Sequence, residues 1–260
     1  MVGRGKKWYG TNGKNCRANR VKGKIVMGHE QKSSAIIVGA GSGLSASFAR
    51  KLASEGMELI LAARDETKLA ALAEETGATT IRCDASVPED VDALFAAADR
   101  QSGTPDLVLY NASFRTRGDF ESLDRDQVRK TLDITAYGAF LVAQQAAQAM
   151  LRRGSGAIFF TGASASVKGY AKSAPFAMGK FALRGLAQSM ARELSPKNIH
   201  VAHFVIDGGI GDSSDPRAAS RGEDGLLHPD AIAESYWQVY RQHRSAWSWE
   251  LELRPWAENF

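Results

Sequence analysis

Residues 35–64, AIIVGAGSGLSASFARKLASEGMELILAAR, decide the fold of this chain. They open with a short apolar run that is typical of a strand buried on both faces. A turn of small residues, GAGSG at 39–43, follows, and then Phe48 and Leu52 recur at helical spacing. Residues 57–62 have the composition of a second strand. Strand, glycine turn, helix and strand within about thirty residues predict a βαβ unit.

The turn at 39–43 has a chemical reason to be rich in glycine. Glycine lets the backbone approach a pyrophosphate closely and place it on the N–H groups of the next helix's first turn. An ordinary tight strand-to-helix turn also favours glycine, so the turn alone leaves both interpretations open. The flanking strand and helix, together with Arg64 at the end of the second strand, favour a dinucleotide site.

Strand and helix patterns alternate along the rest of the chain. We expect helices over 66–75, 88–100, 124–152, 173–194 and 229–242, and strands over 79–82, 106–110, 157–161, 199–206 and 249–253. Residues 207–228 are rich in glycine, serine and aspartate and predict a mobile loop. The alternation predicts an α/β fold: a single-domain, Rossmann-type doubly wound parallel sheet with helices on both faces and ligands at the strands' C-terminal ends.

The formal net charge of +4 is unevenly distributed along the 260 residues. Residues 1–26 hold eight lysines and arginines and no acid, which leaves 25 basic against 29 acidic residues in the remainder. We predict that residues 1–32 are a disordered basic tail and that 33–260 form the folded domain. The tail is either an arm for nucleic acid or an anionic surface, or a leader or upstream-start artefact with Met27 as the usual start. We favour the second alternative.

Composition also narrows the location and the partners. No apolar run is long enough to cross a bilayer. The two cysteines, Cys16 and Cys83, lack the spacing of a metal site or a disulfide, which suits a reducing cytosol. We therefore expect a cytoplasmic protein without membrane contact or a bound metal, and we rank nucleic-acid binding last.

Several motifs stand in the order found in the short-chain dehydrogenase/reductase family, which the chain resembles over about residues 33–254. GAGSGLS at 39–45 resembles the family's GxxxGxG turn, with serine in place of the third glycine. NAS at 111–113 resembles its NNAG segment, and FAMGK at 176–180 resembles its YxxxK helix. DGGI at 207–210 stands where the family has a turn behind the nicotinamide.

The resemblance implies a nicotinamide dinucleotide as cofactor, and Arg64 decides which one. NAD-binding members have an acidic residue at the end of the second strand that accepts hydrogen bonds from the ribose 2′-hydroxyl. A guanidinium at that end can instead pair with a 2′-phosphate, so we predict NADP. A solvated surface arginine is the alternative. The resemblance implies further cofactor contacts at Gly39, Ser42, Gly43, Leu44, Asp84, Ala85, Asn111, Lys180 and Ile210.

The family's catalytic residues are mostly replaced. In the family a lysine four residues after a tyrosine on one helix face lowers the pKa of that tyrosine, which exchanges a proton with the substrate oxygen. Here the tyrosine position holds Phe176, the serine position Ala163 and the asparagine position Thr135, so only Lys180 is retained. The chain resembles a divergent bacterial branch whose members also carry phenylalanine at this place.

A replacement for the missing acid has to come from elsewhere near the lysine. Ser164 follows the fifth strand and Tyr170 lies in the loop beyond it. We predict Tyr170 as the first candidate, with packing of its own loop as the alternative role, and we name Ser164 and Lys180 as further catalytic candidates. Losing a positioned acid costs on the order of 10² to 10⁴ in rate, so activity can survive.

Two functions remain open at this stage. The first is an NADP-dependent oxidoreductase acting on an alcohol or carbonyl group of a small molecule, with an altered proton-transfer site. The second is a catalytically silent NADP(H)-binding sensor or scaffold protein, which the replaced residues favour. The resemblance implies a homodimer or homotetramer built on the long helices expected at 124–152 and 173–194.

Overall fold

The computed structural model describes residues 32–257. Its strands are β1 (Ser34–Val38), β2 (Glu58–Ala63), β3 (Thr79–Arg82), β4 (Leu107–Tyr110), β5 (Gly156–Thr161), β6 (Ile199–Ile206) and β7 (Glu250–Leu253). They form one parallel sheet in the order β3-β2-β1-β4-β5-β6-β7. The order reverses direction between β1 and β4, which is the arrangement of a doubly wound fold.

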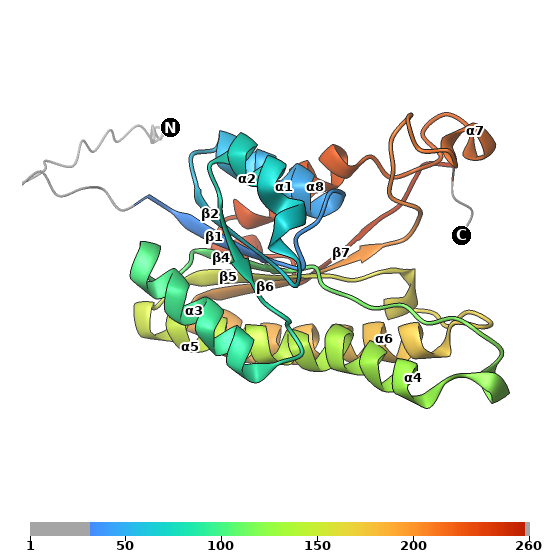
Figure 1. Cartoon of the computed structure of the whole chain (residues 1–260). Coiled ribbons are helices and arrows are strands. Elements are labelled where there is room, and N and C mark those ends of the chain that lie inside the picture. Colours follow the sequence, from blue (N-terminus) through green and yellow to red (C-terminus); the bar gives the residue numbers. More distant parts are fainter. Residues whose placement is uncertain (1–31, 258–260) are drawn as a thin grey trace, which may run out of the picture. The chain divides into compact units, whose positions relative to one another are not determined.

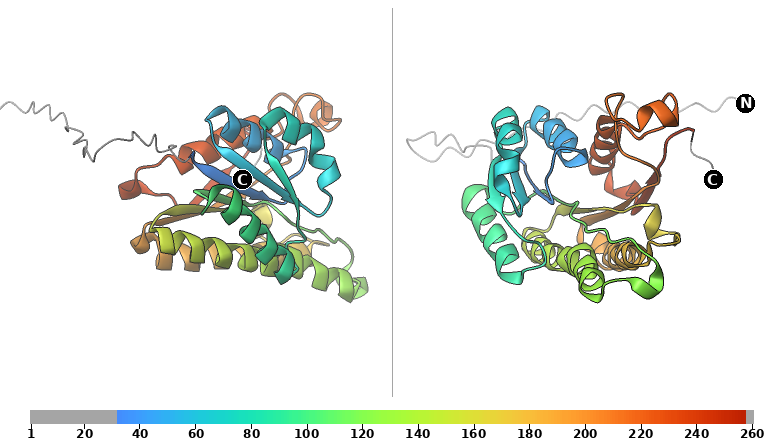
Figure 2. Two further views of the ribbon diagram at one scale, coloured as in Figure 1. Left: turned by 60° about the vertical axis from the view of Figure 1, so that its left-hand side comes forward. Right: turned by 45° about the vertical axis from the view of Figure 1, so that its right-hand side comes forward.

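Helices cover both faces of this sheet. They are α1 (Leu44–Ser54), α2 (Ala70–Thr76), α3 (Pro88–Ser102), α4 (Arg125–Leu132), α5 (Gly138–Arg153), α6 (Ala174–Leu194), α7 (Ala218–Arg221) and α8 (Pro229–Tyr240). Figure 1 shows α1, α2 and α8 on one face and α3, α4, α5 and α6 on the other, and Figure 2 shows the same two helical layers from other directions. The doubly wound α/β architecture predicted from the alternation is confirmed.

The sheet has two cores because successive side chains of a strand point to opposite faces. Ala35 and Ile37 of β1 belong to the core that includes Phe48 of α1. Ile36 and Val38 of the same strand belong to the core on the other face, with residues of α3, α5 and α6. All four strand residues are at most 1 % exposed. Burial on both faces explains why this strand is a continuous apolar run.

Two segments differ from the expectations. The helix expected over 124–152 is interrupted by a π-helical turn at Asp133–Tyr137, which separates α4 from α5. The loop expected over 207–228 contains the short helix α7, and backbone hydrogen bonds between Gly209 and Leu227 and between Gly211 and Leu227 close its two ends together. This pairing gives the segment a defined conformation in the structure.

Among residues 32–257, no helix is both long and apolar enough to cross a bilayer. The basic tail predicted at 1–32 lies almost wholly outside the described residues, so its disorder stays a prediction.

Candidate active site

Two adjoining cavities open at the C-terminal ends of the strands. The larger, here termed the wide cavity, has a volume of about 1080 Å³, and the smaller, the narrow cavity, about 610 Å³. Gly41, Asn111 and Ser113 line both. They follow β1 and β4, the two strands between which the strand order reverses, where open α/β sheets bind ligands.

The glycine turn after β1 is shaped for close approach of a ligand. Gly39 has φ +81°, and a Cβ there would lie 2.3 Å from the backbone nitrogen of Ala112, so this position requires glycine. A Cβ on Gly41 or Gly43 would instead meet no atom within 4 Å. No described side chain caps α1, and no acid stands in its first turn. The turn therefore leaves room and N–H donors for a pyrophosphate.

Ser45, which replaces the third glycine of the motif, braces the turn. Its hydroxyl donates to the carbonyl oxygen of Gly39 at 3.2 Å and accepts from Asn111 Nδ2 at 2.7 Å. Ser45 is 1 % exposed. The serine does more than fit in a small space, because it fixes Asn111 at the junction of the two cavities.

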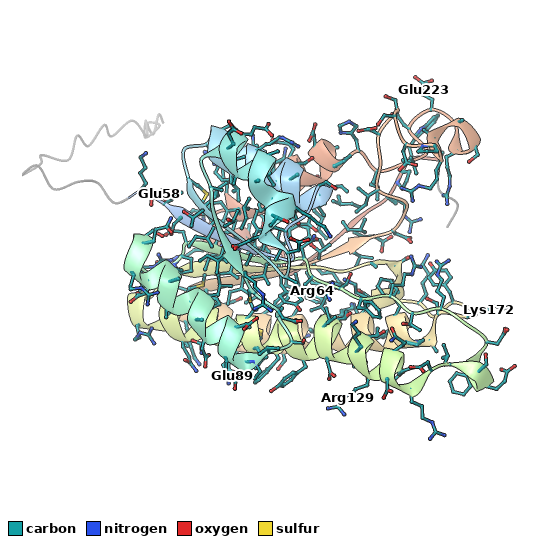
Figure 3. All side chains as sticks on the ribbon, viewed as in Figure 1. Glu58, Arg64, Glu89, Arg129, Lys172 and Glu223 are labelled. Carbon is teal, nitrogen blue, oxygen red and sulfur yellow. The ribbon has the colours of Figure 1, made fainter. Side chains whose placement is uncertain are left out.

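The narrow cavity carries the predicted cofactor-specificity residues. Ser42 and Arg64 line it, and so does Lys68, a second cation that the sequence analysis missed. Asp65 also lines it, but its carboxylate accepts from the Thr67 backbone and hydroxyl and lies 3.2 Å from Lys68 Nζ. Figure 3 shows Glu58 and Arg64 at opposite ends of β2, with Arg64 on the side of the C-terminal strand ends. Two cations therefore line this cavity beyond the end of β2, and the Asp65 carboxylate between them in sequence is already paired.

Asp84 and Ala85 line the same cavity. Burial alone would raise the pKa of Asp84, but hydrogen bonds from Ser86 and the nearby Arg64 charge hold it below its usual range. Asp84 Oδ1 accepts from the Ser86 backbone at 3.0 Å and from its hydroxyl at 2.6 Å. This carboxylate is fixed, ionised and close enough to feel the charge of Arg64.

Lys180 is buried in the lining of the wide cavity. Its side chain comes from the second turn of α6, is 3 % exposed, and donates from Nζ to the Thr161 carbonyl oxygen at 2.7 Å. Burial lowers its pKa to about 7. A lysine with this pKa gains or loses a proton near neutral pH, which is the range an acid–base group needs.

The structure also shows the surroundings of the three positions where family catalytic residues are expected to be replaced, which are Phe176, Ala163 and Thr135. Phe176 is 9 % exposed and lines the wide cavity beside Ala163. Neither side chain can exchange a proton. Thr135 is buried in the π-helical turn, and its hydroxyl accepts from the backbone N–H of Phe114 at 3.2 Å. The aromatic ring near Lys180 is that of Phe176, so it has no hydroxyl group that could exchange a proton.

The remaining predicted site residues also reach the wide cavity. Ser164 and Tyr170 line it, as do the cofactor candidates Gly43, Leu44 and Ile210. Tyr170 is 47 % exposed, and its hydroxyl has no hydrogen-bond partner within residues 32–257. The two cavities therefore bring together all residues predicted to be catalytic or cofactor-binding.

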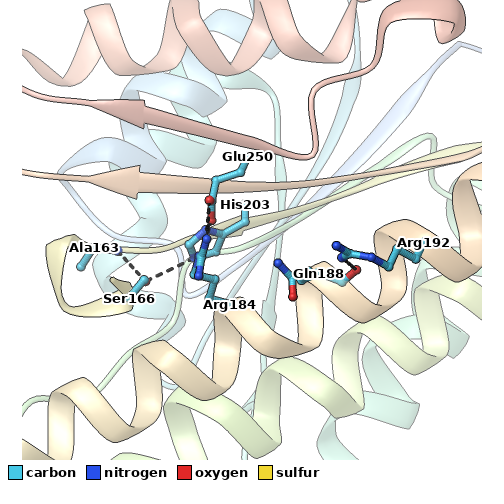
Figure 4. A network of polar contacts seen from close by, with 7 residues as sticks. All are labelled: Ala163, Ser166, Arg184, Gln188, Arg192, His203 and Glu250. Carbon is cyan, nitrogen blue, oxygen red and sulfur yellow. Dashed lines mark hydrogen bonds and ion pairs between the residues drawn. The ribbon is translucent and has the colours of Figure 1, made fainter. Parts of the chain in front are cut away.

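A partly buried polar network joins β6, β7 and α6 (Figure 4). Ser166 Oγ lies 3.3 Å from His203 Nε2, and His203 Nδ1 lies 3.0 Å from a carboxylate oxygen of Glu250. Arg184 of α6 pairs with the same carboxylate at 2.6 Å. Burial lowers the pKa of His203 to about 4, so the ring is neutral at pH 7. Ser166 does not line the cavity, and the network joins β6, β7 and α6 as a structural support.

Sequence reasoning also missed the basic side chains of the wide cavity. Arg115 and Arg117 line it from the loop after β4, and Lys172 lines it from the loop before α6. The only signal in the sequence is that the two arginines closely follow the 111–113 motif. Within residues 32–257 no cluster of three metal-ligating side chains occurs.

Comparison with known proteins places this geometry in a family. A model of the short chain dehydrogenase family matches residues 33–213. Trans-4-hydroxycyclohexanecarboxylate dehydrogenase of Sinomonas cyclohexanicum is 34 % identical over 178 residues, which cover 64 % of this chain and 68 % of that protein.

Two solved structures extend the match beyond the family model. A short-chain dehydrogenase from Rhodopseudomonas palustris is 35 % identical with a TM-score of 0.75, over 86 % of this chain and 99 % of that one. A metagenomic short-chain oxidoreductase in complex with NADP is 25 % identical with the same TM-score, over 86 % and 97 %. The observed fold agrees with these matches, and the chain belongs to the short-chain dehydrogenase/reductase family.

Proposed function

We propose that the chain is an NADP(H)-dependent oxidoreductase that interconverts an alcohol and a carbonyl group in a small molecule. The observation that carries the cofactor choice is the pair of cations, Arg64 and Lys68, in the lining of the narrow cavity. Asp65, the nearest candidate to bind a ribose hydroxyl, already accepts from Thr67 and pairs with Lys68. A guanidinium can bind a 2′-phosphate through two parallel hydrogen bonds.

The residues of both cavities fit a bound dinucleotide. The space beside Gly41 and Gly43 suits the pyrophosphate, and Lys180 would hold the ribose hydroxyls in the wide cavity. When bound, the dinucleotide supplies or accepts the hydride. The NADP complex of the metagenomic relative supports this proposal.

The proton has to move without a tyrosine at position 176. Tyr170 is our first candidate for the acid, because its hydroxyl lacks a partner in the described residues and its side chain lines the wide cavity. Lys180 Nζ is the second, because its pKa of about 7 lets it carry or release a proton near neutrality. Ser164 would hydrogen-bond the substrate oxygen from the end of β5.

Membership of the family also supports proposals on the domain bounds, the oligomeric state and the location of the protein. We propose a domain over 33–260 after the basic tail, a homodimer or homotetramer, a cytoplasmic location, and membership of a branch with phenylalanine at the tyrosine position. The hydroxycarboxylate named for the Sinomonas relative supports a small alcohol as substrate.

Isothermal titration of the full chain with NADPH and NADH tests the cofactor choice. We expect NADPH to bind at least ten times more tightly. Arg64→Gln should reduce NADPH affinity by about 10- to 100-fold, since a hydrogen-bonded charge pair contributes about 1.5–3 kcal/mol, and should leave NADH unchanged. Arg82→Gln is the matched control, because Arg82 ends the neighbouring strand and lines neither cavity. Equal affinity for both nucleotides would contradict the proposal.

A silent NADP(H)-binding sensor is the second candidate function. The observation that favours it is the replacement of proton-transferring groups by Phe176 and Ala163. Single-turnover oxidation of bound NADPH against a carbonyl panel separates the two functions. Turnover that falls in Tyr170→Phe supports the enzyme and its proton donor, whereas tight NADPH binding without turnover on any compound supports the sensor.

A further inference from the structure

The wide cavity carries an excess of positive charge. Besides Lys180, its lining includes Arg115 and Arg117 from the loop after β4, and Lys172 from the loop before α6. Figure 3 shows Lys172 at the end of the molecule toward which the strands' C-terminal ends point. The chain outside its first 26 residues has more acidic than basic residues, so this concentration does not follow from overall composition.

The acidic residue in this lining does not offset the charge. Asp207 follows β6, and its carboxylate lies 2.7 Å from Arg254 Nη2 and 3.2 Å from Lys168 Nζ. One carboxylate is therefore shared by two cations that lie outside the lining. It leaves no net negative charge for the cavity.

Two of the cations in the lining have no acidic partner. Lys172 Nζ lies 2.9 Å from a carboxylate oxygen of Asp119. Within the described part of the chain, no carboxylate lies within ion-pair distance of Arg115 or Arg117. Burial and, to a smaller extent, the Arg117 charge lower the pKa of Arg115. Unpaired neighbouring guanidinium groups are a typical binding arrangement for a carboxylate or phosphate.

Arg115 also stands close to the reacting end of the cavity. Its Cζ lies 4.7 Å from the centre of the Phe176 ring, and Lys180 Nζ lies 5.7 Å from the same centre. The ring at the former tyrosine position thus contacts both cations. A group bound by Arg115 would therefore lie near the ring that Lys180 also adjoins.

The start of α6 adds a second, independent feature. Ser173 is the residue before this 21-residue helix, lines the wide cavity and is 3 % exposed. Its hydroxyl oxygen is buried without a hydrogen-bond partner among the described residues. An unsatisfied buried hydroxyl costs about 1–3 kcal/mol, and the positive end of a helix dipole favours an anion. An anion bound here would accept a hydrogen bond from the Ser173 hydroxyl and would interact favourably with the positive end of the α6 dipole.

We propose that the substrate is anionic, in the simplest case a small hydroxy- or oxocarboxylate, and that Arg115 and Arg117 bind its carboxylate with the aid of Ser173. The inference rests on the proposed oxidoreductase function but concerns binding alone. It makes Arg115, which lies next to the Phe176 ring as Lys180 does, a determinant of substrate specificity.

Calorimetric titration with cyclohexanecarboxylate and its neutral analogue cyclohexanecarboxamide tests the proposal in the full chain, with and without saturating NADPH. We expect the carboxylate to bind at least ten times more tightly than the amide in both states. Arg115→Gln and Arg117→Gln should each remove most of this preference, and Arg115→Lys should keep part of it. Arg152→Gln, an exposed substitution on α5 outside both cavities, should change nothing.

Three results would overturn the inference. Acid and amide could bind equally, the two glutamine variants could keep the full preference, or NADPH could abolish carboxylate binding, which would assign the arginines to the nucleotide. Failure of the proposed function is a separate result, because NADPH binding by the unmodified chain is measured in the same titrations.

Discussion

The Lys180 side chain is hydrogen-bonded and also almost completely buried. Its Nζ is held by the Thr161 carbonyl oxygen at 2.7 Å, and the side chain is almost fully excluded from water. Exclusion from water disfavours the charged form and lowers the pKa from 10.5 to about 7. The unfolded chain would bind that proton up to about pH 10.5, whereas the folded protein releases it above about pH 7.

This difference predicts how stability depends on pH. Between pH 7 and 10.5 the unfolded state binds more protons at Lys180, so the free energy of unfolding rises with pH, by at most about 1.4 kcal/mol per unit. Lys180→Met lacks this contribution and should be more stable than the unmodified protein at pH 7, by a margin that shrinks as pH rises. Urea unfolding at pH 7, 8 and 9 measures it; a constant margin would contradict the burial of a titrating lysine.

The hydroxyl of Ser45 stabilises the turn between β1 and α1, in addition to the glycines that the turn requires. Ser45→Ala removes the hydrogen bonds to Gly39 and from Asn111, and we expect the free energy of unfolding to fall by about 1–2 kcal/mol. Ser47→Ala is the matched control, since Ser47 is buried on the same helix and its hydroxyl has no hydrogen bond within residues 32–257. Urea midpoints compare the two variants, and equal losses would show that the bridge does not stabilise the turn.

The sequence was sufficient to predict the order of these elements. Continuous apolar runs identified buried strands such as β1, and helical spacing identified α1 and α3, because these patterns reflect burial directly. The π-helical turn before Gly138 was not predictable. A Cβ at Gly138 would lie 2.6 Å from the Ala85 carbonyl oxygen and 2.7 Å from the Tyr110 hydroxyl, and such a tertiary contact leaves no periodic signal.

The candidate site likewise contains residues that the sequence could predict and residues that only the structure reveals. The residues predicted to bind the cofactor were named from sequence motifs and strand ends, and all of them line one of the two cavities. Arg115 and Arg117 come from a loop without periodicity, so only the structure shows which way the loop carries them. His203 and Glu250 are partners because β6 and β7 pair in a register that aligns them, across 47 positions of sequence.

Large exposed hydrophobic side chains lie on two neighbouring helices of the molecule. Tyr137, Phe140, Met178 and Phe181 on the π-helical turn, α5 and α6 are each between 42 % and 49 % exposed. The rings of Tyr137 and Phe140 are stacked at 6.3 Å. Figure 1 shows α5 and α6 side by side on the same face of the sheet. Exposed aromatic side chains grouped on neighbouring helices are typical of a subunit interface.

We therefore expect the full chain to be a dimer or tetramer in solution by light scattering. The double variant Phe140→Glu/Phe181→Glu should lower the mass to that of the monomer, because it would bury charges without partners in the interface. Glu74→Lys on α2 changes charge at an exposed place on the opposite face of the sheet and should leave the mass unchanged. A monomeric unmodified chain, or a double variant that stays associated, would contradict the expectation.

The shared wall of the two cavities has a consequence for inhibitor design. Gly41, Asn111 and Ser113 belong to both linings, so fragments selected separately for each cavity would bind next to one another. Joining such fragments makes the second binding event intramolecular, and the gain depends on whether the linker matches the span. Gly41 leaves open space for such a linker where the two linings meet, because even a Cβ on this residue would lie more than 4 Å from any atom of a non-adjacent residue.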